Sequence, residues 1–215
     1  MLEDIKNLRK DYRAHTLGAG DVKESPILQF SAWFEEAVAA QLPEPNAMTL
    51  ATSTLDGAPS ARIVLLKGVD EQGFVFYTNY ESRKGKVLSQ NPKAALVFLW
   101  HELQRQVRVE GGVERVSKEE SEAYFQSRPK GSQIGAWVSP QSQIIIRRED
   151  LEEKAAALEQ QYARAEHLPL PPNWGGFRLH PTLMEFWQGR SNRLHDRIQY
   201  TLLADNKWKI ERLAP

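Results

Sequence analysis

The first forty residues carry apolar positions at the spacing of an α-helix. This spacing predicts a short amphipathic helix over residues 2–13. A polar stretch with two glycines predicts a linker over 14–23. Ser25 and Pro26 are typical of an N-cap and a first helical residue, so a second helix is expected from there, ending before Pro43.

From residue 47 the apolar positions change to the period of a β-strand. A hairpin is predicted around Asp56 and Gly57, because both central positions of such a tight turn favour positive φ. The predicted strands are 48–54, 61–67, 74–79, 94–100, 106–114, 183–188, 197–203 and 207–213. Helices are predicted from near Ser82, over 117–126 and over 149–164, with a break at 169–172. Short strands at hairpin spacing indicate a β-rich α+β barrel rather than a βαβ sheet.

The composition narrows the class of protein. The chain has 215 residues, 28 Lys and Arg, 28 Asp and Glu, and no cysteine. This excludes a disulfide framework and a cysteine nucleophile, and a neutral chain is a poor candidate for coating nucleic acid. A charged N-terminus and short apolar runs predict a cytoplasmic protein that does not enter a membrane. We expect an N-terminal helix and flexible segment over 1–24 and a single domain over 25–215.

Several common catalytic and phosphate-binding motifs are absent from the chain. It has no dinucleotide glycine fingerprint, no GxxxxGK loop, no HExxH or paired histidines, and no GxSxG elbow. No metal site is therefore predicted. Any bound phosphate must be held by side chains from strands and turns.

Basic residues gather at the ends of predicted elements. Arg62 and Lys67 bracket an apolar strand, where two solvated strand-end charges are the alternative interpretation. Arg83 and Lys84 follow Ser82 at a helix start, where backbone N–H groups and cations together suit an anion. A basic first turn without function is the alternative, although it opposes the helix dipole.

A second polar group is spaced by four residues. Tyr124, Arg128 and Ser132 would share one helix face if the helix continued past Arg128, but Pro129 favours a loop around Ser132. A phenol, a guanidinium and a hydroxyl together suit a phosphate. Ordinary surface positions are the alternative.

A third group follows Trp187 near the C-terminus. Arg193, His195 and Arg197 alternate, so they would point to one side if this segment were extended. A surface turn without function is the alternative.

Ten short strings resemble, in order, the pyridoxamine 5'-phosphate oxidase family. They are RIVLLK (62–67), FYTN (76–79), SRK (82–84), RQV (105–107), SRP (127–129), SQIGAWVSPQS (132–142), WGGFR (174–178), EFWQG (185–189), RLHDR (193–197) and ERLAP (211–215). The resemblance covers residue 47 to Pro215, with a shorter match at 8–12. It implies an FMN-binding split β-barrel with peripheral helices that forms a homodimer with FMN at the interface. The implied reaction oxidises pyridoxamine or pyridoxine 5'-phosphate to pyridoxal 5'-phosphate and reduces O2 to H2O2.

The resemblance also implies roles for individual residues. The flavin contacts of one subunit would be Arg62, Ile63, Val64, Leu65, Leu66, Lys67, Tyr77, Thr78, Arg83 and Lys84. Those of the other subunit would be Gln106, Gln141, Ser142, Trp187 and Arg197. The substrate contacts would be Arg9, Lys10, Asp11, Tyr12, Lys67, Tyr124, Arg128, Ser132, Arg193, Leu194 and His195. Arg193, His195 and Arg197 would act in catalysis, and no residue is assigned as an obligatory general base.

Two other functions compete with the oxidase. A split barrel that binds flavin or pyridoxal phosphate without turnover would not need a second phosphate site. A barrel for single-stranded nucleic acid would need basic and aromatic residues interleaved along its strands, and these strands are too apolar.

Overall fold

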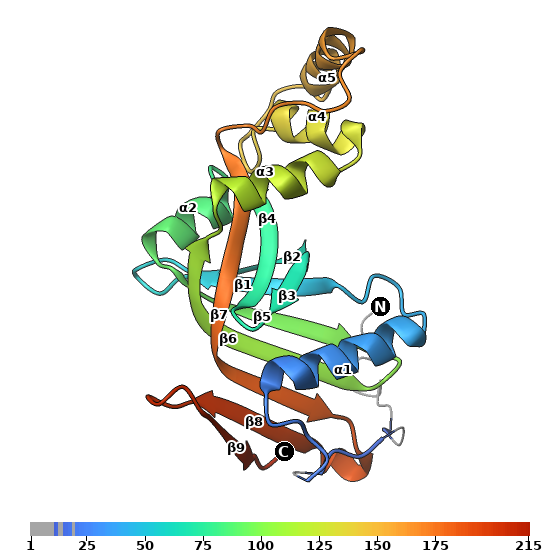
Figure 1. The fold of residues 1–215 in the computed structure, drawn as a ribbon, viewed down its shortest axis with the longest axis vertical. Coiled ribbons are helices and arrows are strands. Elements are labelled where there is room, and N and C mark those ends of the chain that lie inside the picture. Colours follow the sequence, from blue (N-terminus) through green and yellow to red (C-terminus); the bar gives the residue numbers. More distant parts are fainter. Residues whose placement is uncertain (1–10, 13–14, 19) are drawn as a thin grey trace, which may run out of the picture.

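The computed structural model describes residues 11–12, 15–18 and 20–215 (Figure 1). The helix predicted over 2–13 therefore lies outside the described residues, apart from Asp11 and Tyr12, which belong to no helix or strand. No helix among the described residues combines the length and apolar character needed to cross a membrane.

In the described part of the chain, nine antiparallel strands form one sheet. They are β1 (Ala47–Ser53), β2 (Pro59–Leu65), β3 (Gly68–Asp70), β4 (Gly73–Asn79), β5 (Lys93–Trp100), β6 (Arg105–Arg115), β7 (Trp174–Gln188), β8 (Asp196–Leu202) and β9 (Trp208–Arg212). The order is β2-β1-β5-β6-β7-β4-β3, and β8 pairs with both β7 and β9. The predicted hairpin around Asp56 and Gly57 is confirmed as the β1–β2 pair. The short strand β3 was not predicted.

The sheet curls until its two edges meet. After β2, the Leu66 N–H donates to the carbonyl of Asn46 beside β1 (2.9 Å), and the Lys67 N–H donates to the carbonyl of Val75 in β4 (2.8 Å). These two residues connect the edge strands β2 and β3, which lie near each other in Figure 1. The segment that follows β2 is thereby hydrogen-bonded to the residue before β1 on one side and to β4 on the other.

Strand β7 is far longer than the predicted strand 183–188. It begins at Trp174 and pairs with β4, β6 and β8 along its length. Two glycines and Pro181 interrupt the apolar pattern of its first half, which is why the sequence did not reveal it. The β6–β7 register shifts between Glu110 and Gly111, opposite Pro181, and a Cβ at Gly111 would lie only 1.9 Å from the carbonyl oxygen of His180. A glycine is therefore required at this irregularity.

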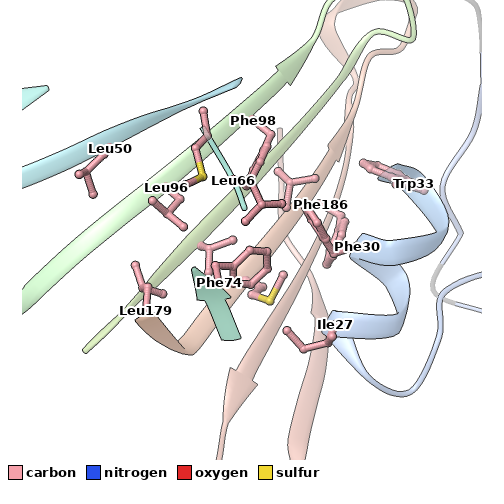
Figure 2. Packing of buried hydrophobic residues seen from close by; sticks show 14 of the residues in the cluster. Ile27, Phe30, Trp33, Leu50, Leu66, Phe74, Leu96, Phe98, Leu179 and Phe186 are labelled. Atoms are coloured by element: carbon pink, nitrogen blue, oxygen red, sulfur yellow. The ribbon is translucent and has the colours of Figure 1, made fainter. Parts of the chain in front are cut away.

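Helix α1 (Pro26–Ala39) covers one face of the sheet. Pro26 occupies its first turn as predicted, although the Ser25 side chain makes no capping hydrogen bond. Both Phe30 and Trp33 are buried: Phe30 packs against Phe74 and Phe98, and Trp33 packs against Phe186 (Figure 2). Burial of these aromatic side chains fixes the helix on the main core.

The remaining helices lie away from α1. They are α2 (Arg83–Gln90), α3 (Lys118–Ser127), α4 (Lys130–Val138) and α5 (Glu149–Gln161). Ser82 and Ser117 cap α2 and α3 through their hydroxyl groups, as predicted. Helices α3, α4 and α5 gather at one end of the molecule, opposite β8 and β9 (Figure 1). Phe125, Ile134, Leu168 and Trp174 form a second, smaller core there.

Pro129 ends α3 but does not leave Ser132 in a loop. A new helix, α4, starts at Lys130 directly after the proline and carries Ser132 in its first turn. The loop expected around Ser132 is therefore wrong. Proline lacks the N–H that a helix interior needs, but it is compatible with the residue before a new helix.

Candidate active site

A cavity of about 620 Å³ lies between the strands and the second core. It is lined by Ile63, Val64, Leu65, Lys67, Tyr77, Thr78, Asn79, Lys84, Tyr124, Arg128, Pro129, Ser132, Gly135, Ala136, Ser139, Gln141 and Trp174. Most of the residues predicted for one flavin half-site and for the substrate phosphate therefore share one cavity. Its described lining contains three cations and no carboxylate, so the cavity favours an anionic ligand.

Lys84 forms a polar cluster at the cavity with the end of β4. Its ammonium donates to the hydroxyl of Thr78 (3.0 Å) and to the side-chain oxygen of Gln141 (2.9 Å). Gln141, predicted to serve the flavin of the other subunit, thus also contacts Lys84 of its own chain, and its predicted role at the flavin stays a prediction. The turn after α4 brings it there, and Ser142 follows at a positive φ of 71°.

Arg62 and Arg83 lie close to Lys84. The Arg62 guanidinium donates to the hydroxyls of Thr52 (2.8 Å) and Ser60 (2.7 Å), and no carboxylate within the described chain pairs with any of the three cations. Burial, and then the charge of Arg83, lower the pKa of Arg62. Burial and the charge of Arg62 likewise lower the pKa of Lys84. Like charges held together without a counter-charge are what a phosphate site requires.

Arg128 lies in the same cavity beside the second core. Its guanidinium carbon is 4.7 Å from the centre of the Trp174 ring, and its Nη1 is buried without a hydrogen-bond partner. Burial lowers the pKa of this arginine. A buried donor without a partner is costly, so the half-buried Arg128 is suited to an anionic ligand.

Tyr124 is held by an aromatic stack beside Arg128. The rings of Tyr77 and Tyr124 are stacked with centroids 4.0 Å apart, and Trp174 lies nearly parallel to both. Burial is the main reason that the pKa of Tyr77 rises to about 12, so this phenol stays neutral. Trp174 lines the cavity but was not predicted as a site residue; only its place in the WGGFR string drew attention to it.

The segment 62–67 presents a mixture of side chains and backbone. Ile63 and Lys67 are exposed, and both line the cavity. Leu66 points into the main core instead, so of its atoms only the backbone could serve a ligand.

A second group of predicted residues forms around Trp187. Gln106 faces Trp187 across the β6–β7 pair, and both line a cavity of about 300 Å³ with Tyr12. The His195 ring lies 4.6 Å from Trp187 and 5.9 Å from Tyr12. Arg9 and Lys10 lie outside the described residues.

His195 has a defined hydrogen-bonding arrangement. The backbone N–H of Arg190 donates to its Nδ1 (3.1 Å), so the neutral ring carries its proton on Nε2. Burial, and then the charge of Arg193, lower the pKa of His195 below 6.5. The ring is therefore neutral at pH 7 and offers an Nε2–H donor.

The predicted alternation of Arg193, His195 and Arg197 is wrong. Residues 191–193 form a 3-10 turn in which Arg193 has a φ of 62°, so the segment is not extended. Arg193 and Leu194 are exposed beside this turn. Arg197 lies in β8, where its guanidinium donates to both carboxylate oxygens of Glu185 (2.8 and 3.0 Å). Glu185 is 3% exposed and was missed, because its partner is distant in the sequence.

The two groups of site residues lie at opposite ends of β7. Trp174 starts the strand beside the larger cavity, and Trp187 nears its end. Thirteen residue steps at about 3.3 Å give a path of about 43 Å along the strand. One chain therefore does not bring both groups around a single small ligand.

The chain matches two family models that together cover most of its length. The model described as pyridoxamine 5'-phosphate oxidase matches residues 34–187. The model described as pyridoxine 5'-phosphate oxidase C-terminal dimerisation region matches residues 174–215. The second match supports a homodimer built through β7, β8 and β9.

Curated relatives and solved structures agree with these matches. The pyridoxine/pyridoxamine 5'-phosphate oxidase of a Nostoc species is 60% identical, covering 98% of both chains. That of Salinibacter ruber is 56% identical over 100% of both. The solved structure of PhzG from Burkholderia lata, in complex with tetrahydrophenazine-1-carboxylic acid, has a TM-score of 0.89 at 32% identity, covering 96% of this chain and 100% of that one.

A second solved structure shows the fold alone. A pyridoxamine 5'-phosphate oxidase-related, FMN-binding protein from Nostoc punctiforme has a TM-score of 0.72 at 19% identity and covers 90% of this chain and 100% of its own. The predicted fold class, a β-rich split barrel with peripheral helices, is confirmed. The cavity, the fold and both family matches show that this chain belongs to the pyridoxamine 5'-phosphate oxidase family.

Proposed function

We propose that this protein oxidises pyridoxamine or pyridoxine 5'-phosphate to pyridoxal 5'-phosphate, with FMN as cofactor and O2 reduced to H2O2. The observation that carries the proposal is one cavity whose described lining has no carboxylate and holds cations with different partners, Lys84 on Thr78 and Gln141, and Arg128 on Trp174. FMN and the substrate each bring one phosphate, so an oxidase of this kind needs two such cationic groups. The relatives at 56–60% identity bear the name of this activity.

The cationic group around Lys84 fits the phosphate of FMN. Arg62, Arg83 and Lys84 supply the positive charge, while Thr78 and Gln141 hold the ammonium of Lys84 in place. When bound, FMN would accept the two electrons that leave the substrate and pass them to O2. The protein's part is to hold both molecules in register and to exclude water.

The cationic group at Arg128 fits the phosphate of the substrate. Arg128 offers its unused Nη1 donor, and Tyr124 and Ser132 add hydroxyl groups in the same cavity. Lys67 lines the cavity as well and can neutralise either phosphate. A bound phosphate group would orient the substrate ring, and correct placement of reacting atoms contributes strongly to rate.

A second copy of the chain would complete the site. Gln106, Trp187 and His195 lie at the far end of β7 from the large cavity, so they can join a flavin only when contributed by a partner subunit. The neutral Nε2–H of His195 would then donate to the substrate, and exposed Arg193 would add a charged contact. Arg197 would act as a cation whose charge is shared with Glu185.

The test is an absorption spectrum of the purified protein, followed by measurement of O2 consumption with an oxygen electrode. The purified protein is expected to be yellow with one FMN per chain, and to consume O2 and release H2O2 with pyridoxamine 5'-phosphate. A colourless protein that takes up no FMN would refute the flavin site. A yellow protein that stays oxidised under anaerobic substrate would instead favour the binder without turnover.

The subunit arrangement has its own test. Sedimentation of the active, FMN-loaded protein is expected to show a dimer. A species of 24.6 kDa that holds FMN and turns over substrate would contradict a shared site. The cytoplasmic location remains a prediction.

A further inference from the structure

Trp174 stands out among the cavity residues because its aromatic ring contacts Arg128, the cation proposed for the substrate phosphate. It is 8% exposed and begins β7, where its backbone is fixed by pairing with Asn79 of β4. Its ring therefore has a rigid position. Trp174 also lines the cavity.

The Arg128 guanidinium lies over the Trp174 ring at 4.7 Å. An aromatic face attracts a guanidinium through its quadrupole and through dispersion, and it uses none of the five N–H donors. A carboxylate could also hold the arginine, but it would cancel the charge and occupy the donors. The ring therefore fixes Arg128 while leaving it free to bind an anion.

The backbone of Arg128 is fixed separately. The side-chain amide of Gln133, which is fully buried, donates to the Arg128 carbonyl (2.9 Å) and accepts from the N–H of Leu168 (2.8 Å). The Arg128 N–H donates to the Phe125 carbonyl at the end of α3 (3.2 Å). With the backbone held in this way, the direction of the side chain depends on what it packs against.

We infer that Trp174 is a positioning residue that orients Arg128 and so sets the preference for phosphorylated substrates. This inference rests on the proposed function, since it assigns Arg128 to the substrate phosphate. The ring also lies nearly parallel to Tyr124, at 6.2 Å between centroids, so it helps to orient the second phosphate contact. Preorganised donors bind more tightly because less side-chain freedom is lost on binding.

The experiment compares Trp174→Leu, Trp174→Phe and a matched control in the FMN-loaded enzyme. The control is Trp33→Leu, because Trp33 is also buried beneath an arginine, Arg105, at 4.4 Å, but in the main core. Arg105 is already paired with Glu36 and Gln188, so its donors serve no ligand. Both leucine variants lose a ring of equal size.

The measurement is the ratio of kcat/KM for pyridoxamine 5'-phosphate to that for pyridoxamine. A desolvated cation–π contact predicts a fall of about five- to thirtyfold in Trp174→Leu, mainly through KM, and a smaller fall in Trp174→Phe. Trp33→Leu should keep the wild-type ratio, whatever its stability. Inorganic phosphate, titrated by calorimetry into the FMN-loaded proteins, should bind more weakly to Trp174→Leu and equally to Trp33→Leu.

An unchanged ratio and unchanged phosphate affinity in Trp174→Leu would overturn the inference. If Trp174→Leu does not fold, an unchanged ratio in Trp174→Phe has the same meaning. A fall of this kcat/KM ratio in Trp33→Leu would show a general effect of core damage and would also overturn the inference. Failure of the proposed function is distinguishable, because the wild-type enzyme would then oxidise neither substrate.

Discussion

The substitution Lys84→Met tests whether the cations around Lys84 are assembled for a ligand rather than for the fold. The change removes the charge but keeps the length and most of the volume of the side chain. Burial of Lys84 and the charge of Arg62 both lower the pKa of Lys84. The charged form of Lys84 is therefore disfavoured in the folded protein without ligand. Removing the charge therefore relieves repulsion and desolvation.

The expected magnitudes differ for stability and for binding. Two hydrogen bonds from Lys84, to Thr78 and Gln141, are lost, each worth about 0.5–1.5 kcal/mol, and the relieved repulsion offsets them. The free energy of unfolding without FMN should thus stay within about 1 kcal/mol of the parent. A charged hydrogen bond to phosphate is worth about 1.5–3 kcal/mol, so the Kd for FMN should rise about ten- to hundredfold.

Denaturant unfolding of the flavin-free protein and a fluorescence titration with FMN give the two quantities. Lys86→Met is the matched control, because Lys86 is an exposed lysine of the same helix that does not line the large cavity. It should leave both values unchanged. FMN affinity equal to the parent in Lys84→Met, or a large loss of stability without FMN, would refute the reasoning.

Four further outcomes are expected. Arg128→Ala should raise KM for pyridoxamine 5'-phosphate about ten- to hundredfold with normal flavin content, measured by steady-state kinetics, because one charged contact is lost. In anaerobic stopped-flow, Arg193→Ala should slow flavin reduction by about tenfold or more through loss of positioning and of a charged contact, and His195→Ala less so; unchanged rates in both variants would remove them from the site. The pKa of His195 is lowered by burial and by the charge of Arg193, so the ring gains a proton only at acidic pH; that proton would occupy Nδ1 and break the bond from the Arg190 N–H, so the rate should fall as His195 is protonated, and a pH profile that is the same in the parent and in His195→Ala would contradict this arrangement. Glu185→Gln should destabilise the protein by about 1–3 kcal/mol in denaturant unfolding, because the charged hydrogen bonds from Arg197 and Arg108 to the buried carboxylate are weakened, and no measurable change would show that these pairs are not needed.

Elements with local signals were predicted well. The β1–β2 hairpin follows from Asp56 and Gly57, and the starts of α2 and α3 follow from Ser82 and Ser117, because turn and cap preferences act between residues a few positions apart. The first half of β7 was missed for the opposite reason. The first half of β7 is held as a strand by pairing with β4 and β6, and the local sequence around Pro181 does not predict that pairing.

In the candidate site, too, residues close in sequence were predicted and contacts between distant residues were missed. The cluster of Arg83 and Lys84 was visible because both residues sit at one helix start. Trp174 and Glu185 were missed as partners of Arg128 and Arg197, because only long-range pairing brings them together. The alternation of Arg193 and His195 suggested an extended segment, and the structure has a turn with positive φ there instead.

The sequence by itself determined the local elements, the absence of cysteine chemistry, and the presence of enough cations in the right strings to identify the family. Only the tertiary structure decided that Gln141 joins Lys84 within one chain, that Arg128 lies on Trp174, and that the Trp187 group lies at the far end of β7. The physical reason is that distances between residues far apart in the chain depend on sheet register and curl. These are set by the sum of many pairings along the sheet, and no short stretch of sequence contains that sum.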